Sequence, residues 1–297
     1  MNRRHFLHRS SMGVAALSMT QLDWLRTWLP QEWKINMLTD NIGVFTERGG
    51  TIGFLLSNDG IVVVDAQFPE QSKHLIDELK KRSEKPFKLL INTHHHGDHS
   101  AGNISFKGIV EHVLAHENSK ANQERVAKGQ NTEANQLYPD QTFSSTWCND
   151  SGKEKICLYY FGAAHTNGDA VIHFQHANIA HMGDLVFNRR HPFVDRSAGA
   201  NMKSWISVLD QTQKKLDKKT KYVFGHSGNG FDITGTHEDL QKFSEYLSQV
   251  LAFTEKEIKA GKSKEEFLKT TSLPFDTEWK GDGLERPLGA AYDELTS

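Results

Sequence analysis

The residues best suited to chemistry lie in a short run, His-His-His-Gly-Asp-His, at positions 94–99. His94, His96, Asp98 and His99 place four potential metal ligands close together in the chain. Imidazole and carboxylate groups are preferred ligands of Zn²⁺ and similar divalent ions. The alternative is a chance polyhistidine tract on a surface loop, but apolar residues 89–91 lead into the run as a buried strand would. The run therefore predicts a metal site.

Three later residues have the right type and setting to complete that site. His165 follows a predicted strand at 156–161, Asp184 follows one at 179–182, and His226 follows one at 222–224. Small residues adjoin each of them, which allows close backbone approach at a crowded centre. Any one alone is as well explained as an ordinary loop residue. All three together, after the histidine run, predict the second half of a two-metal site.

These ligands require rigid elements to hold them. Alternating and continuous apolar runs predict strands at 33–38, 42–46, 51–57, 61–64, 87–92, 156–161, 170–174, 179–182 and 222–224. Apolar spacing and capping residues predict helices at 69–83, 117–130, 201–216 and 236–258, and a short terminal helix from Ser263. No repeat or Pro/Gly-rich linker divides the chain, so residues 30–297 are predicted to form one α/β domain.

Composition narrows the class of partner. The 297 residues carry 35 basic and 37 acidic side chains, a net charge of −2. This balance gives no electrostatic reason to expect nucleic acid. No segment reaches the roughly 18 apolar residues of a membrane-spanning helix. A small-molecule substrate is expected, and the sequence leaves the oligomeric state open.

The N-terminus and the two cysteines indicate where the protein works. Arg3 and Arg4 precede a modest apolar stretch at 12–17, a pattern typical of a twin-arginine export signal over residues 1–18. A periplasmic or otherwise exported protein is expected; the alternative is a basic amphipathic helix on a cytosolic protein. Cys148 and Cys157 flank a turn-rich segment. They either form a disulfide across a hairpin or remain two unpaired thiols.

With these residues in view, the sequence resembles the metallo-β-lactamase fold superfamily over roughly residues 33–230. The resemblance rests on Asp65, the His-x-His-x-Asp-His run, Gly162-x-x-His165, Gly183-Asp184 and Gly225-His226. It implies an αββα sandwich of two mixed β-sheets flanked by helices, here with extra C-terminal helices. It places His94, His96 and His165 on a first metal. It places Asp98, His99 and His226 on a second metal, with Asp184 bridging the two metals. Asp65 would lie outside the ligand set and steady the histidine loop.

The resemblance also implies a chemistry. Two divalent ions, expected to be Zn²⁺ with Fe or Mn as alternatives, would share a hydroxide that attacks a β-lactam, lactone, thioester or similar centre. Asp98 would both bind the second metal and orient that hydroxide. Phe187, Arg189 and Arg190 are candidate substrate contacts, and a solvated basic loop is the alternative for the arginines.

Two departures from the family's branches bear on the substrate. Asp184 stands where the cysteine-ligated lactamases have their cysteine, which disfavours that branch. Phe187 stands where lactonases of the quorum-quenching type carry a tyrosine. Two other classes stay open: an iron-dependent oxidoreductase on the same fold, and a non-catalytic metal-binding protein.

Overall fold

The computed structural model describes residues 32–275 and 278–297. The predicted export signal at residues 1–18 lies outside the described residues. Within the described part, no helix is both long and apolar enough to cross a membrane.

The first β-sheet carries the chain from the start of the domain through the histidine run. Its strands β1 to β4 pair antiparallel in chain order, and β4 to β7 continue the sheet in parallel. The strands are β1 (Lys34–Met37), β2 (Ile42–Thr46), β3 (Ile52–Leu56), β4 (Ile61–Val64), β5 (Phe87–Asn92), β6 (Val110–His116) and β7 (Gln141–Phe143).

The second β-sheet has the order β15-β13-β11-β10-β9-β8. Strands β11 and β13 pair in parallel, and the other neighbours are antiparallel. Its strands are β8 (Thr146–Ser151), β9 (Glu154–Tyr159), β10 (Val171–Phe174), β11 (Ile179–His181), β13 (Lys221–Val223) and β15 (Thr234–Gly235). A separate parallel pair joins the short strands β12 (Phe187–Asn188) and β14 (His226–Ser227).

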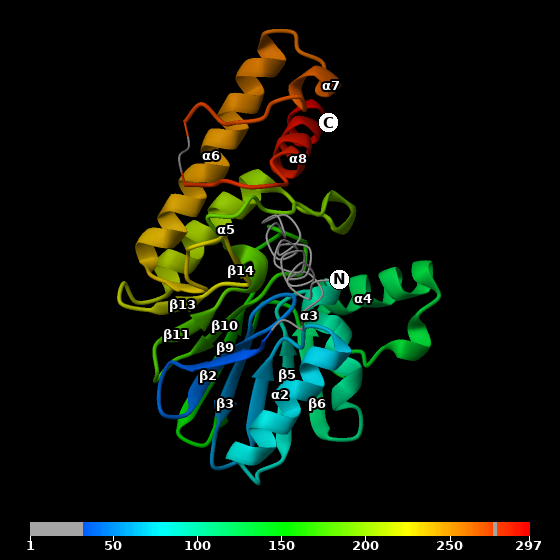
Figure 1. Cartoon of the computed structure of the whole chain (residues 1–297), viewed down its shortest axis with the longest axis vertical. Helices are drawn as coiled ribbons and strands as arrows, with labels where there is room; N and C mark the ends of the chain where they lie inside the picture. Colours follow the sequence, from blue (N-terminus) through cyan, green and yellow to red (C-terminus); the bar gives the residue numbers. More distant parts are fainter. Residues whose placement is uncertain (1–31, 276–277) are drawn as a thin grey trace, which may run out of the picture. The chain divides into compact units, whose positions relative to one another are not determined.

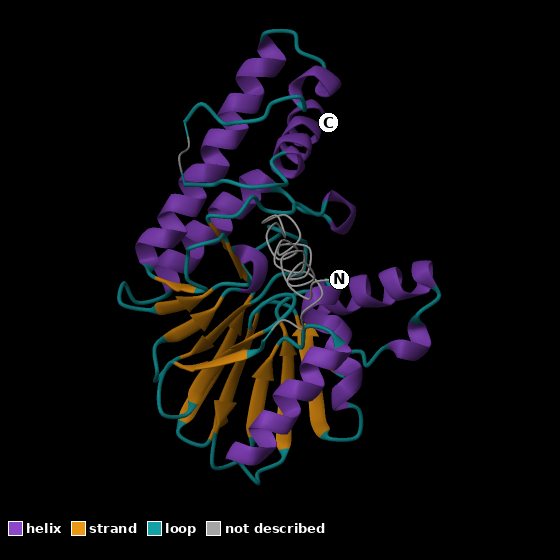
Figure 2. Cartoon of the chain, in the orientation of Figure 1, coloured by secondary structure: helices purple, strands orange, loops and turns teal. Residues whose placement is uncertain are grey.

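Helices cover the outer faces of both sheets (Figures 1 and 2). Side chains such as Val44 and Ile172 form one apolar cluster between the sheets. Leu75 of helix α2 packs on the far side of the first sheet, and Trp205 of α5 and Phe243 of α6 pack on the far side of the second. The helices are α2 (Pro69–Arg82), α3 (Gly97–Ser100), α4 (Glu117–Gln130), α5 (Met202–Lys215), α6 (His237–Lys259), α7 (Lys264–Phe267) and α8 (Glu285–Thr296). The predicted αββα sandwich with C-terminal helices is confirmed.

Some elements differ from the prediction. Strands β6, β7 and β8 were not predicted, and in β6 the exposed Glu111 and His112 interrupt an otherwise apolar run. Helix α8 was not predicted either, because Pro287 lies near its start. Proline fits there because the first turn of a helix has amide groups without intrahelical partners.

Strands β8 and β9 form a hairpin with Cys148 directly opposite Cys157. The two cysteines form a disulfide, so the alternative of two unpaired thiols does not hold. This bond covalently ties an edge strand to the strand that leads toward His165.

Replacing both cysteines by serine should lower the free energy of unfolding by about 2 kcal/mol, because the short loop closed by the disulfide would gain freedom in the unfolded chain. Denaturant unfolding of the wild type with and without reductant measures the same effect. The double serine variant is the control, since reductant should leave its midpoint unchanged. An unchanged wild-type midpoint after verified reduction would contradict the prediction.

Candidate metal centre

The seven predicted ligands come from segments that follow strands, at one edge of the sandwich. His94, His96, Asp98 and His99 follow β5 of the first sheet. His165 follows β9 of the second sheet, and Asp184 follows β11. His226 begins the short strand β14, just after β13. Packing the two sheets face to face therefore brings residues from distant parts of the chain to one place.

The first group of ligand atoms consists of three imidazoles and one carboxylate oxygen. His96 Nδ1 lies 2.9 Å from His165 Nε2. Asp184 Oδ2 lies 3.5 Å from His165 Nε2 and 3.9 Å from His94 Nε2. These four residues each offer an atom within 4.8 Å of the others, a spacing compatible with one shared cation.

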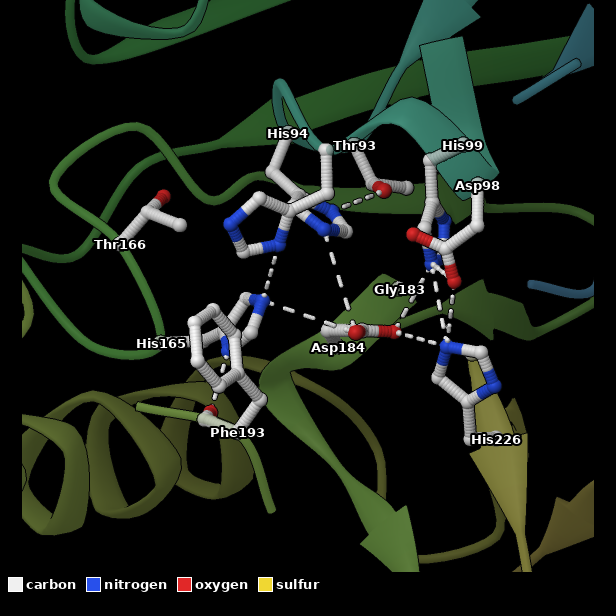
Figure 3. Close-up of polar contacts among 12 residues, drawn as sticks. Thr93, His94, Asp98, His99, His165, Thr166, Gly183, Asp184, Phe193 and His226 are labelled. Carbon is white, nitrogen blue, oxygen red and sulfur yellow. Dashed lines mark hydrogen bonds and ion pairs between the residues drawn. The ribbon is translucent and has the colours of Figure 1, made fainter. Parts of the chain in front are cut away.

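The second group lies on the other side of Asp184 (Figure 3). His226 Nε2 is 3.1 Å from Asp98 Oδ2 and 3.4 Å from His99 Nε2. Asp184 Oδ1 lies 3.0 Å from His99 Nε2 and 3.4 Å from His226 Nε2. The two oxygens of one carboxylate thus face the two groups separately, which is the arrangement of a bridging ligand.

Hydrogen bonds on the outer side of the rings fix how three of the imidazoles point. His165 Nδ1 donates to the carbonyl oxygen of Phe193 at 2.8 Å. Asp65 Oδ2 lies 2.8 Å from His99 Nδ1 and accepts from Thr93 Oγ1 at 2.7 Å. Thr93 Oγ1 in turn lies 3.0 Å from His94 Nδ1. Such outer partners select the tautomer whose inner nitrogen has a free lone pair, as around metal-bound histidines generally.

The ring nitrogens that face the centre of the site, here called the inner nitrogens, show whether a cation fits there. His94 Nε2 is buried and has no hydrogen-bond partner among the described residues. Once the outer nitrogen of His165 donates, its inner nitrogen presents a lone pair toward His96 Nδ1. Buried acceptors that face one another without a donor are costly. A divalent cation between them removes that cost, so the donor set fits a metal.

Comparison with known proteins agrees with this geometry. The family model of the metallo-beta-lactamase superfamily matches residues 45–226, more than half of the chain. The chain belongs to the metallo-beta-lactamase superfamily. Metallo-beta-lactamase IND-1 of Chryseobacterium indologenes is 26% identical over 190 residues, covering 62% of this chain and 75% of that protein. Metallo-beta-lactamase type 2 of Bacillus cereus is 26% identical over 207 residues, covering 66% and 77%.

Solved structures share the fold. The metallo-beta-lactamase from Pontibacter korlensis superimposes with a TM-score of 0.60 at 20% identity, covering 73% of this chain and 99% of that one. A double mutant of the sec-alkyl sulfatase PisA1 gives a TM-score of 0.68 at 14% identity, covering 88% of this chain and 50% of that one. At these identities the likeness concerns the fold alone.

In the metal-free site, burial and neighbouring charges shift the pKa values of several ligand residues. Burial lowers the pKa of His226, but the carboxylates of Asp184 and Asp98 outweigh it and raise that pKa to about 9. Burial raises the pKa of Asp98, but His99 and His226 outweigh it and lower that pKa to about 2. Burial lowers the pKa of His165 to about 3. Burial also lowers the pKa of His99, but the neighbouring carboxylates outweigh it and raise that pKa well above its usual value. The metal-free site therefore holds its protons on the His99 and His226 side.

Metal binding at neutral pH should release at least one proton per chain. With a raised pKa, His226 is protonated at pH 7.5 and must lose its proton before Nε2 can bind a cation. The apparent metal affinity should consequently rise with pH until about pH 9. Calorimetric zinc titrations in buffers of different ionisation enthalpy measure the proton count. A binding enthalpy independent of the buffer at pH 7.5 would contradict this expectation.

Asp195 is a site residue that the sequence analysis missed. Its Oδ2 lies 3.0 Å from His96 Nε2 and 3.6 Å from His95 Nε2. Its Oδ1 accepts from Ser197 Oγ at 2.6 Å and from the amide of Ala198 at 3.1 Å. Asp195 therefore gives His96 the outer partner that Asp65 gives His99. Nothing in its spacing signals this role, since it lies in a loop far from the histidine run.

Substituting Asp195 by Ala should weaken metal binding by roughly 10- to 100-fold, the usual effect of removing a partner outside the ligand set. The loss should concern the first metal group, because His96 belongs to it. Competition titration with a chromophoric chelator measures both affinities. Asp210→Ala is the matched control, since Asp210 is exposed and pairs with Lys214. Equal affinities for Asp195→Ala and the control would refute the role.

Of the three predicted substrate contacts, two line the cavity at the site and one does not. Phe187 and Arg190 line a cavity of about 320 Å³ that also holds His96, Asp98, His165, Asp184 and His226. The Phe187 ring stacks on His226, with centroids 5.5 Å apart. Arg189, in contrast, is buried, and its guanidinium pairs with Asp239 at 2.6 Å and Glu278 at 3.0 Å. We correct the assignment of Arg189: its contacts are to the C-terminal helical segment rather than to a substrate.

Proposed function

We propose that the protein is a di-zinc hydrolase acting on small carbonyl or ester-type substrates. The observation that carries this proposal is the position of Asp184, whose two oxygens face two separate ligand groups. A site for a single cation needs only one of these groups. The pairing of both around one buried carboxylate supports a dinuclear centre.

The donor set supports zinc and a hydrolytic reaction. Five imidazoles and two carboxylates are borderline-soft and hard donors that suit Zn²⁺, although iron and manganese accept the same types. Two divalent ions held here would lower the pKa of a shared water from about 15.7 toward 7 and polarise the electrophile. No other described group has to act as the nucleophile.

Asp98 is the ligand best placed to handle protons during the reaction. Its side chain is 31% exposed, whereas that of Asp184 is 4% exposed and that of His99 is fully buried. Asp98 therefore faces the cavity that a substrate would enter. From this position its carboxylate can both bind the second metal and hold a hydrogen bond to an attacking water.

Two observations bear on the class of ester-type substrate. Two relatives are named metallo-beta-lactamases, which supports a β-lactam among the candidates. Asp184 in place of a cysteine ligand favours a different branch, and lactones and thioesters then become the alternatives. The Cys148–Cys157 disulfide supports the predicted export, because disulfides persist in oxidising compartments.

Metal analysis combined with a substrate panel tests this function. The purified protein should contain two zinc ions per chain and hydrolyse at least one member of a panel of β-lactams, lactones, thioesters and phosphoesters. Treatment with chelator should abolish that activity, and added zinc should restore it. Asp184→Asn should lose both metal binding and activity.

Hydrolysis that persists after verified metal removal would refute the proposal. One iron per chain, with thiol oxidation instead of hydrolysis, would favour the oxidoreductase alternative.

A further inference from the structure

The cavity over the metal ligands is also lined by a residue from the C-terminal helix. Arg286, in the first turn of α8, lies on the cavity wall together with Arg190 from the loop after β12. Arg286 lies well beyond residue 226, where the match to the family model ends. The C-terminal segment thus adds a cationic group to a site whose metal ligands all precede it.

Unlike Arg189 and Arg196, the two cavity arginines lack a close carboxylate partner among the described residues. Arg189 pairs with Asp239 and Glu278, and Arg196 lies 3.7 Å from Glu294. Within the described residues, Arg190 has no carboxylate in ion-pair range. Arg286 has only its neighbour Glu285, at 3.9 Å, and both side chains are at least half exposed. Such an exposed, distant ion pair contributes little free energy and does little to neutralise the Arg286 guanidinium.

The acidic residues of the cavity do not compensate these charges either. Asp98 and Asp184 face His226 and His99 at 3.0 to 3.7 Å, inside the ligand groups. Their negative charge is therefore committed to the metal centre. The guanidinium groups of Arg190 and Arg286 remain available to a ligand in the cavity.

The surrounding fold fixes the backbone positions of both arginines before a ligand arrives. At Arg189 the chain turns with φ +54°, so that Arg189 is buried while Arg190 is exposed. Two positions after Arg286, the buried Leu288 anchors α8 in the apolar cluster that also contains side chains of α6. Glu294 of α8 also accepts from the amide of Met202 at 2.7 Å, tying the helix to α5. Because the backbone of both arginines is already placed at the cavity, ligand binding requires no backbone ordering there.

Apolar rings border the same cavity. Phe187 is buried against His226, and Phe193 is 44% exposed beside His96. An exposed phenylalanine at the rim of a polar site offers a contact for an apolar part of a ligand. Cationic and apolar groups therefore surround the space above the ligands.

We propose that the substrate of this site is an amphiphilic anion, with an oxyanion group bound by Arg190 and Arg286 and an apolar portion against Phe187 and Phe193. Guanidinium groups suit carboxylate and sulfate-type oxyanions alike because both accept paired hydrogen bonds. The proposal rests on the proposed hydrolase function for the reaction, but anion binding can be measured without any turnover.

Calorimetric binding of three phenyl-substituted probes to the zinc-loaded protein tests it. Phenylbutanoate and phenylbutanesulfonate carry oxyanions, and phenylbutanamide is their neutral counterpart. Arg286→Gln and Arg190→Gln should each weaken binding of at least one oxyanion by about tenfold relative to the amide, as expected for a lost charge-assisted hydrogen bond. The probe that shows the loss identifies carboxylate or sulfonate as the preferred group.

Lys269→Gln is the matched control, because Lys269 is a 72% exposed cation of the same C-terminal segment with a distant partner, Glu265. It should leave the affinities for all three probes unchanged. Equal losses for amide and oxyanions, no loss in either arginine variant, or the same loss in the control would overturn the proposal. Metal content is verified in every variant, so a failed hydrolysis panel would refute the reaction without affecting this result.

Discussion

The arrangement of this site depends on imidazole lone pairs that converge in one small space at the edge of the two sheets. His96 Nδ1 and His165 Nε2 lie 2.9 Å apart, and His94 Nε2 has no partner among the described residues. Buried acceptors without donors cost roughly 1–3 kcal/mol each. The outer nitrogens of these rings cannot relieve this cost, because Asp195, Phe193 and Thr93 already hold them. The arrangement becomes favourable when cations lie between the inner atoms.

The stacking of the two sheets makes this convergence possible. Their stacked strands deliver Asp184 from one sheet within reach of His94 and His99 from the other. The approach is so close that a Cβ at Gly225 would collide with Asp184 Oδ1. Gly183, with φ +49°, packs its backbone against Thr93. These two glycines let the bridging carboxylate reach the centre of the site.

Sequence analysis identified the residues that converge at this site more completely than the residues that support them. His165, Asp184 and His226 were found because each follows a strand that an apolar run makes visible. Asp195 and Arg286 act on the site from a loop and from a distant helix, and only tertiary packing brings them there. Arg189 was misjudged because charge in a sequence does not reveal burial; here Asp239 and Glu278 compensate a buried guanidinium. Strand β6 was missed for a related reason, since its exposed end is polar.

If Asp184 bridges two zinc ions, anomalous diffraction at the zinc edge from crystals of the zinc-loaded protein will show both ions beside it. We predict two peaks, one beside Asp184 Oδ2 with His94, His96 and His165, and one beside Asp184 Oδ1 with Asp98, His99 and His226. A single peak at full zinc loading, or two peaks that do not share Asp184, would contradict the account.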